Sequence, residues 1–226
     1  MSDAEDERTA DRPTDAELLR AHVDGDPDAF GVLFGRHRDR LWAVALRTTG
    51  NPEDASDGLQ DGMIAAYRRA GSFRGDAAVT TWLHRVVVNA CLDRLRAAKV
   101  RRTETMPEDV EDRGTLVAAA TEEDDPSAVA VVSERRRRVL AALASLPPEQ
   151  RAALVLVDME GYPVSEVALM LDCAEGTVKS RCSRGRTRLA AVLADLRPAT
   201  GDEPPGNPPP TGDVPTTAPP RGPPRT

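Results

Sequence analysis

Hydrophobic and polar residues alternate with the period of an α-helix along two stretches of the chain, about residues 14–100 and 127–197. The clearest buried stripe, at i, i+4, i+7 and i+11, consists of Val178, Cys182, Gly185 and Leu189. Neither stretch repeats itself at the period of a solenoid. The pattern therefore predicts an all-α protein made of two small helical domains.

Helix start signals fall inside these stretches. Thr14 and Glu17 have the spacing of a capping box, in which a hydroxyl and a carboxylate each satisfy a backbone amide. Pro52 and Pro148 are each followed by acidic residues, which is typical of a first helical turn. Ser127 is a further candidate cap. We therefore expect helices to begin near these four positions.

Three segments lack the helical pattern. Residues 103–125 contain nine acidic residues and one arginine, and residues 198–226 contain 11 of the 19 prolines. Such segments have too few large apolar side chains to offset the entropy of ordering. The predicted organisation is a disordered acidic N-terminus (1–13), two helical domains (14–100 and 127–197) joined by a flexible acidic linker (101–126), and a disordered proline-rich tail (198–226).

The composition narrows the class of protein. Only 3% of the 226 residues are aromatic, and no apolar run approaches the roughly 18 residues that span a membrane. The acidic N-terminus is unlike a signal peptide, so we expect a cytoplasmic protein. Cys91, Cys173 and Cys182 have no CxxC spacing and are interpreted as buried apolar residues. We expect neither a metal nor a cofactor.

Although the net charge of the chain is -7, two predicted helices are strongly basic. Residues 81–102 and residues 176–190 each carry a local charge of +5. A single basic helix face often has no partner other than water. Two basic helices on separate domains favour a polyanionic partner.

A helix-turn-helix is predicted over about residues 162–189. Two helical patterns, at 165–171 and 175–189, are separated by three residues. This is the spacing of a DNA-binding helix-turn-helix, whose second helix reads the major groove. Its polar positions supply forked donors and hydroxyls for bases and phosphates.

A second polar stripe lies on the helix predicted over residues 80–96. Its members, at i, i+4, i+8 and i+11, are Arg85, Asn89, Asp93 and Arg96. The preceding loop, residues 71–78, begins with a glycine and carries Phe73, Arg74 and Asp76. An aromatic ring and a guanidinium on such a loop can hold an unstacked base, although ordinary amphipathicity also explains most of the stripe.

In sequence order, these blocks resemble the extracytoplasmic-function class of bacterial RNA polymerase sigma factors, group 4 of the sigma-70 family, and in particular its SigM-type members. The resemblance runs from Asp15 to Leu193 and includes NPEDASDGLQDGMIAAYRRAGSF and TWLHRVVVNACLDRLR. It implies a region 2 domain that binds polymerase and the -10 promoter element, and a region 4 domain that binds the -35 element. It also implies promoter-specific initiation and strand separation without enzymatic chemistry.

The resemblance assigns roles residue by residue. The DxxQ motif of the core-binding helix matches Asp57 and Gln60, with Glu53, Asp54 and Asp61 around it. The -10 contacts would be Ser72, Phe73, Arg74, Asp76, Arg85, Asn89, Asp93 and Arg96, with Trp82 as support. The -35 contacts would be Glu175, Gly176, Thr177, Lys179, Ser180, Arg181, Ser183, Arg184 and Arg186.

The implied partners are core RNA polymerase, through the clamp helices of its largest subunit and its beta flap, and promoter DNA. An anti-sigma factor, commonly membrane-anchored, would hold the protein inactive until a stress response. The acidic linker would imitate RNA in the exit path, and a solubilising spacer is the alternative. No small-molecule substrate is implied.

Some positions depart from the family pattern. Gly58 and Gly62 lie inside the core-binding helix, where each costs about 1 kcal/mol relative to Ala, so we expect this helix to order only on polymerase. Asp172 replaces a turn glycine and can adopt the left-handed conformation. Ala174 replaces a capping Ser, which leaves the start of the recognition helix less firmly fixed.

Three other classes of protein compete with this interpretation. An enzyme has little support, because the chain has no P-loop, HExxH or GxSxG motif, and His22, His37 and His84 have no motif-spaced partners. A duplex-binding regulator that works without polymerase needs only the C-terminal block, not the DxxQ helix. A helical adaptor without a nucleic-acid role needs neither basic helix.

Overall fold

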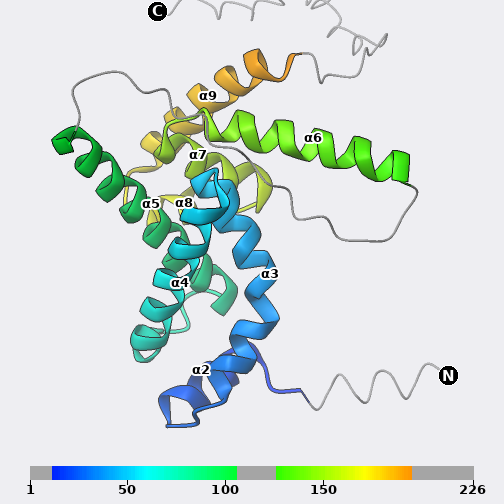
Figure 1. Cartoon of the computed structure of the whole chain (residues 1–226). Coiled ribbons are helices and arrows are strands. Elements are labelled where there is room, and N and C mark those ends of the chain that lie inside the picture. Colours follow the sequence, from blue (N-terminus) through cyan, green and yellow to red (C-terminus); the bar gives the residue numbers. More distant parts are fainter. Residues whose placement is uncertain (1–11, 106–125, 195–226) are drawn as a thin grey trace, which may run out of the picture. The chain divides into compact units, whose positions relative to one another are not determined.

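The computed structural model describes residues 12–105 and 126–194, and every regular element in these ranges is helical (Figure 1). The first range contains α2 (Asp15–Val23), α3 (Ala29–Thr49), α4 (Pro52–Arg69), the 3-10 turn η1 (Ala70–Ser72) and α5 (Val79–Thr105). The second contains α6 (Pro126–Ala144), α7 (Pro148–Leu154), the π-helix η2 (Val155–Met159), α8 (Val164–Met170) and α9 (Glu175–Val192). The all-α prediction is confirmed.

The helix boundaries follow from local capping. Thr14 and Glu17 form both halves of the expected capping box, and the hydrogen bonds from Thr14 lower the pKa of Glu17. The side chain of Asn51 accepts from the amide of Asp54 at 2.7 Å and begins α4. Gly50 ends α3 at a φ of 84°, a left-handed conformation that glycine adopts without strain. These predicted starts are therefore confirmed.

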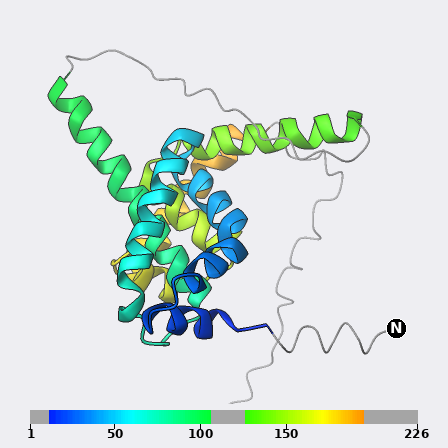
Figure 2. The same cartoon turned by 60° about the horizontal axis from the view of Figure 1, so that its bottom comes forward.

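Helices α2 to α5 pack around one apolar cluster. Its fully buried side chains include Leu33, Leu41, Leu83 and Val87. Burying a side chain of this size stabilises the fold by about 1.5–3 kcal/mol. The cluster fixes α4 against α5, which lie side by side in Figures 1 and 2 and carry the predicted polymerase-binding and -10 residues.

Two glycines set the approach of α4 to α5. A Cβ on Gly58 would lie 2.6 Å from Sγ of Cys91, and one on Gly62 would lie 2.9 Å from Cα of Val87. Any side chain would therefore push the helices apart. Because this packing offsets the low helix propensity of glycine, α4 is continuous, and the expectation that it orders only on polymerase was wrong.

Helices α6 to α9 pack around a second cluster, which also takes in side chains from α3 and α5. Its members include Leu143, Val155, Leu156 and Val178 together with Val44, Val88 and Leu92. The two sets of helices are thus joined by shared apolar burial. All the described helices belong to one compact unit.

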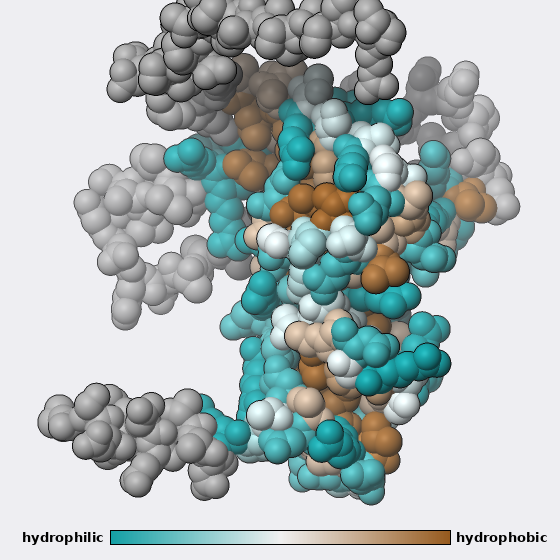
Figure 3. Space-filling view, turned by 180° about the vertical axis from the view of Figure 1, so that it is seen from behind, coloured by the Kyte–Doolittle hydropathy of each residue, from teal (hydrophilic) through white to brown (hydrophobic). Residues whose placement is uncertain are grey.

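The acidic N-terminus, most of the acidic linker and the proline-rich tail lie outside the described residues. The face shown in Figure 3 is mostly hydrophilic, with separate hydrophobic areas between polar ones. Within the described ranges, no helix combines the length and hydropathy needed to cross a membrane.

Candidate nucleic-acid interface

The helix-turn-helix has the predicted geometry. Helices α8 and α9 are joined by a short turn in which Asp172 has a φ of 48°, the left-handed conformation expected of it. The amide of Cys173 donates to the carbonyl of Ala168 at 3.0 Å and closes the turn. As expected, Ala174 precedes α9 without a side-chain cap.

Helix α9 buries one stripe and exposes its other faces. The buried stripe contains Val178, Cys182 and Gly185, as predicted. A Cβ on Gly185 would lie 2.5 Å from Cδ1 of Leu154, so only glycine allows α9 this close to α7. The predicted -35 residues that are exposed are Glu175, Gly176, Lys179, Ser183, Arg184 and Arg186, and those that are half-buried are Thr177, Ser180 and Arg181.

Two arginines among the predicted -35 residues of α9 contact other groups of the protein. Arg186 donates two hydrogen bonds to the carboxylate of Asp158, at 2.9 and 2.6 Å, and this pairing raises the pKa of Arg186. Nη1 of Arg181 lies 3.6 Å from Sγ of Cys173. These contacts fix the direction of two guanidinium groups on the helix surface.

The residues predicted to bind a single strand converge on one groove. The groove has a volume of about 940 Å³ and is bordered by the loop after η1, by α5 and by α8. Seven of the eight predicted -10 residues line it, namely Ser72, Phe73, Arg74, Asp76, Arg85, Asn89 and Asp93. The structure thus brings together side chains from a loop and a helix that the sequence places up to 21 positions apart.

An aromatic pair forms part of the groove. The rings of Phe73 and Trp82 meet edge to face, with centroids 5.7 Å apart. Both side chains are half-buried and pack against the first apolar cluster. Trp82 therefore packs directly against Phe73 at the edge of the groove.

Two members of the polar stripe have partners in the C-terminal helices. The amide nitrogen of Asn89 donates to the carbonyl of Met170 at 2.9 Å. Arg96 lies outside the groove lining, 2.8 Å from Asp93 and 3.6 Å from Glu149. Sequence spacing located the stripe, but it contained no signal for contacts between residues about 50 to 80 positions apart.

The acidic face of α4 is partly paired. Arg94 on α5 contacts the carboxylate of Asp57 and lies 3.4 Å from that of Asp54. Glu53, Gln60 and Asp61 are exposed. In the sequence, Arg94 stands out only as a basic residue, and its spacing gives no signal for this pairing. Asp61, the neighbour of Gln60, is thus an exposed carboxylate on this helix.

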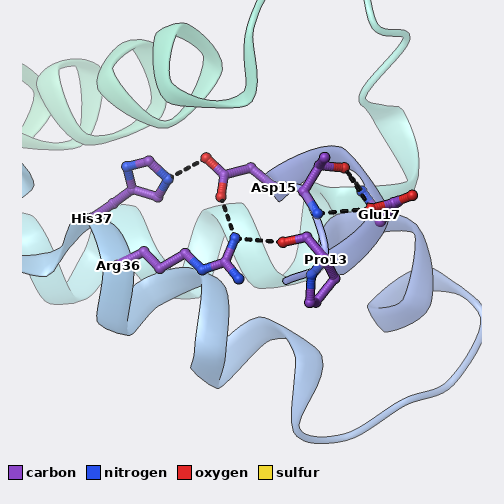
Figure 4. Close-up of polar contacts among 6 residues, drawn as sticks. Pro13, Asp15, Glu17, Arg36 and His37 are labelled. Carbon is purple, nitrogen blue, oxygen red and sulfur yellow. Dashed lines mark hydrogen bonds and ion pairs between the residues drawn. The ribbon is translucent and has the colours of Figure 1, made fainter. Parts of the chain in front are cut away.

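The histidines pack helices together. Asp15 on α2 accepts from Arg36 at 3.1 Å and contacts His37 at 2.6 Å, and Arg36 also donates to the carbonyl of Pro13 (Figure 4). These contacts tie α2 to α3. His84 is fully buried. Among the described residues, no group of His, Cys, Asp and Glu side chains could hold a metal ion.

Residues 33–101 match the Sigma-70 region 2 family, and residues 136–189 match the Sigma-70, region 4 family. Over 185 residues the chain is 54% identical to the ECF RNA polymerase sigma factor SigM of Mycobacterium tuberculosis, covering 81% of this chain and 86% of that protein. The sigma factor RpoE from Bartonella quintana, solved with the anti-sigma factor NepR, has the same fold, with a TM-score of 0.59 at 24% identity over 75% of this chain and 99% of RpoE. CnrH, solved with the cytosolic domain of CnrY, gives a TM-score of 0.53 at 27% identity over 81% of this chain and 99% of CnrH.

The fold and the two candidate DNA-binding faces define a sigma-70-type transcription initiation factor. The chain belongs to the extracytoplasmic-function sigma factors. Proteins of this family direct initiation and catalyse no reaction of their own, so the prediction that this is not an enzyme is confirmed.

Proposed function

We propose that the protein binds core RNA polymerase, directs it to promoters with -35 and -10 elements, and promotes melting of the -10 element. The observation that supports this most is the convergence of seven predicted -10 residues on one groove. Region 2 would comprise residues 14–100 and region 4 residues 127–197, with the acidic linker between them.

In this proposal α9 lies in the major groove of the -35 element. Its exposed Lys179 and Arg184 would contact phosphates and base edges, and its hydroxyls would make adaptable contacts. The remaining predicted -35 residues would contribute from the same helix faces.

At the -10 element, the loop with Phe73 and Arg74 would receive an unstacked base. Extruding one base costs a few kcal/mol, which stacking on the aromatic ring and contacts with the guanidinium can offset. The stripe through Arg85 and Asn89 would follow the separated strand. Melting then results from differential binding of the open strand, without covalent chemistry.

The exposed face of α4 would dock on the clamp helices of the polymerase largest subunit, and region 4 on the beta flap. We further propose that the protein acts in the cytoplasm, that a membrane-anchored anti-sigma factor restrains it, and that its promoters belong to a stress regulon. The structure of RpoE bound to an anti-sigma factor supports the proposal that this chain also has an anti-sigma factor as a partner. The proposal includes no cofactor and no small-molecule substrate.

Run-off transcription with purified core polymerase and genomic promoter fragments tests this function. We expect promoter-specific transcripts from the wild type and their loss with the double change Gln60→Ala, Asp61→Ala, which removes two exposed side chains and leaves the Arg94 pairing intact. Asp39→Ala removes an exposed carboxylate on α3 and is the matched control. Duplex binding without any polymerase-dependent transcript would instead support the stand-alone regulator.

A further inference from the structure

A single cation binds two carboxylates of α4 in and beside the predicted polymerase-binding motif. Arg94 of α5 donates a hydrogen bond from Nη2 to Oδ2 of Asp57. Its Nε lies 3.4 Å from Oδ1 of Asp54, about one helical turn earlier. One guanidinium therefore bridges two carboxylates on adjacent turns of α4.

The close packing of α4 on α5 brings Arg94 within reach of Asp57. Gly58 follows Asp57 in α4, and Cys91 precedes Arg94 by about one turn of α5. A Cβ on Gly58 would lie 2.6 Å from Sγ of Cys91, so a side chain at this position would push the helices apart. The side chain of Arg94 thus reaches across to α4 and is only 30% exposed.

Asp54 is also held by the start of its own helix. Nδ2 of Asn51, the N-cap residue of α4, donates to Oδ2 of Asp54 at 2.6 Å, and the amide of Asp54 donates to Oδ1 of Asn51 at 2.7 Å. The carboxylate of Asp54 is therefore fixed relative to the first turn of α4. Through its ion pair with Arg94, it fixes the cation that contacts Asp57.

Asp57 remains accessible although it is paired. Its side chain is 42% exposed, and the hydrogen bond from Arg94 goes to Oδ2. An ionised carboxylate has about four acceptor positions on its two oxygens, so Asp57 can still accept from a second cation. Arg94 thus restricts the direction of this carboxylate without burying it.

Two effects of Arg94 favour a partner that binds this face. Asp54 and Asp57 lie at i and i+3 and would repel each other without the cation between them. A side chain that is already held in one direction also loses less conformational entropy when a partner binds. Repulsion between Arg94 and a cation of the partner opposes these effects, but water and salt screen it because both side chains are partly exposed.

We propose that Arg94 is a positioning residue for polymerase binding, which holds the carboxylate of Asp57 in the direction in which a cationic group of core polymerase binds it. Arg94 acts through Asp57 and does not itself contact polymerase. This inference rests on the proposed function. Gln60 and Asp61 are exposed on the next turn of α4 and would make contacts that do not depend on Arg94.

Binding of purified core polymerase to the fluorescently labelled chain, measured by anisotropy, tests the role of Arg94. Arg94→Gln removes the bridge and one positive charge. Arg38→Gln removes one positive charge from an exposed position of α3 and is the matched control. If net charge alone mattered, both changes would strengthen binding to a cationic partner equally. A positioning role predicts the opposite sign for Arg94→Gln.

We expect Arg94→Gln to bind core polymerase about fivefold more weakly than Arg38→Gln, which is near the upper limit for a partly exposed ion pair. Arg94→Lys keeps the charge but not the fork that bridges two carboxylates, so its affinity should lie between those of the wild type and Arg94→Gln. An affinity of Arg94→Gln equal to that of Arg38→Gln would overturn the positioning role. A higher affinity would also overturn it, and would show that Arg94 competes with polymerase for Asp57.

A double-mutant cycle separates positioning from a general effect on the fold. In a chain that already carries Asp57→Asn, Arg94→Gln should change the affinity for core polymerase by less than about twofold, because no carboxylate is left to position. Equal losses in both backgrounds would indicate a merely structural role and would overturn the inference. If Arg94→Gln does not fold, the same cycle with Arg94→Lys decides the question.

Core binding by the wild type distinguishes the failure of this inference from the failure of the proposed function. If the wild type binds core polymerase and Arg94→Gln binds it as Arg38→Gln does, the positioning role is wrong and the proposed function stands. If the wild type does not bind core polymerase, the proposed function fails and the positioning role fails with it.

Discussion

Arg186 of the recognition helix and Asp158 of the π-helix η2 form a two-pronged ion pair, with hydrogen bonds of 2.9 and 2.6 Å. An arginine on the face proposed to bind DNA is therefore paired with a neighbouring carboxylate. This pairing orients the side chain but reduces the positive charge that α9 offers to phosphates.

Asp158→Asn should therefore strengthen duplex binding. The change frees Arg186 to neutralise one phosphate, which steepens the dependence of log K on log salt by about one unit. Anisotropy titrations of a promoter duplex between about 50 and 200 mM salt measure the slope. Adding Arg186→Ala should return the slope to the wild-type value, and a slope that stays steep would show that another residue is responsible.

Gly58→Ala and Gly62→Ala should each destabilise region 2, although alanine is the better helix former by about 1 kcal/mol. The added methyl group would lie within 3 Å of α5, and overpacking of this kind costs about 1–3 kcal/mol. Urea denaturation measures the free energy of unfolding.

Gly31→Ala and Gly35→Ala in α3 are the matched controls, because a Cβ there meets nothing within 4 Å. They should stabilise the protein by about 0.5–1 kcal/mol. If all four changes had the same sign, the close approach of α4 to α5 would not be the reason for the buried glycines.

His84 should make the protein less stable in acid. Burial lowers the pKa of His84 to about 4, from 6.5 for a free imidazole, so the unfolded chain binds the proton more readily. Stability from this group is complete above pH 6.5 and falls by about 1.4 kcal/mol per pH unit as the pH drops toward 4. His84→Gln lacks this titration, so the difference in unfolding free energy between the two proteins should vary with pH across this window. A constant difference would contradict the buried, neutral ring.

The three cysteines should differ in reactivity. Burial raises the pKa of the Cys91 thiol to about 12 and also raises that of Cys182, whereas Cys173 is only half-buried. The prediction that all three are buried was therefore wrong for Cys173, which lies in the turn before α9. Alkylation with iodoacetamide at pH 8, followed by peptide mass spectrometry, should modify Cys173 first. Equal labelling of Cys91 in the folded protein would contradict its burial.

Local signals were enough to predict much of the fold. The capping box at Thr14, the proline at position 52 and the stripe from Val178 each act within a few residues, and the structure reproduces them. The left-handed Asp172 also follows from its own chemistry.

Contacts between distant residues were not predictable in this way. Gly58 looked unfavourable because helix propensity is a local quantity. The reason for a glycine there is the close contact with Cys91, which lies 33 positions further along the chain. The pairing of Arg94 with the acidic face of α4 and the bond from Asn89 to Met170 likewise depend on packing that no sequence spacing records.

The π-helix η2 makes the ion pairs of Asp158 and Glu160 sensitive to the number of residues in this segment. The amide of Glu160 donates to the carbonyl of Val155, five residues back, so this turn holds one residue more than an α-helical turn. Deleting one apolar residue from η2 would restore the α-helical turn. It would leave either Asp158 about 100° out of register with Arg186, or Glu160 equally out of register with Arg40 and Arg47. Loss of a single apolar residue here would thus break the connection that runs from the recognition helix α9 through η2 to α3, although every charged side chain would still be present.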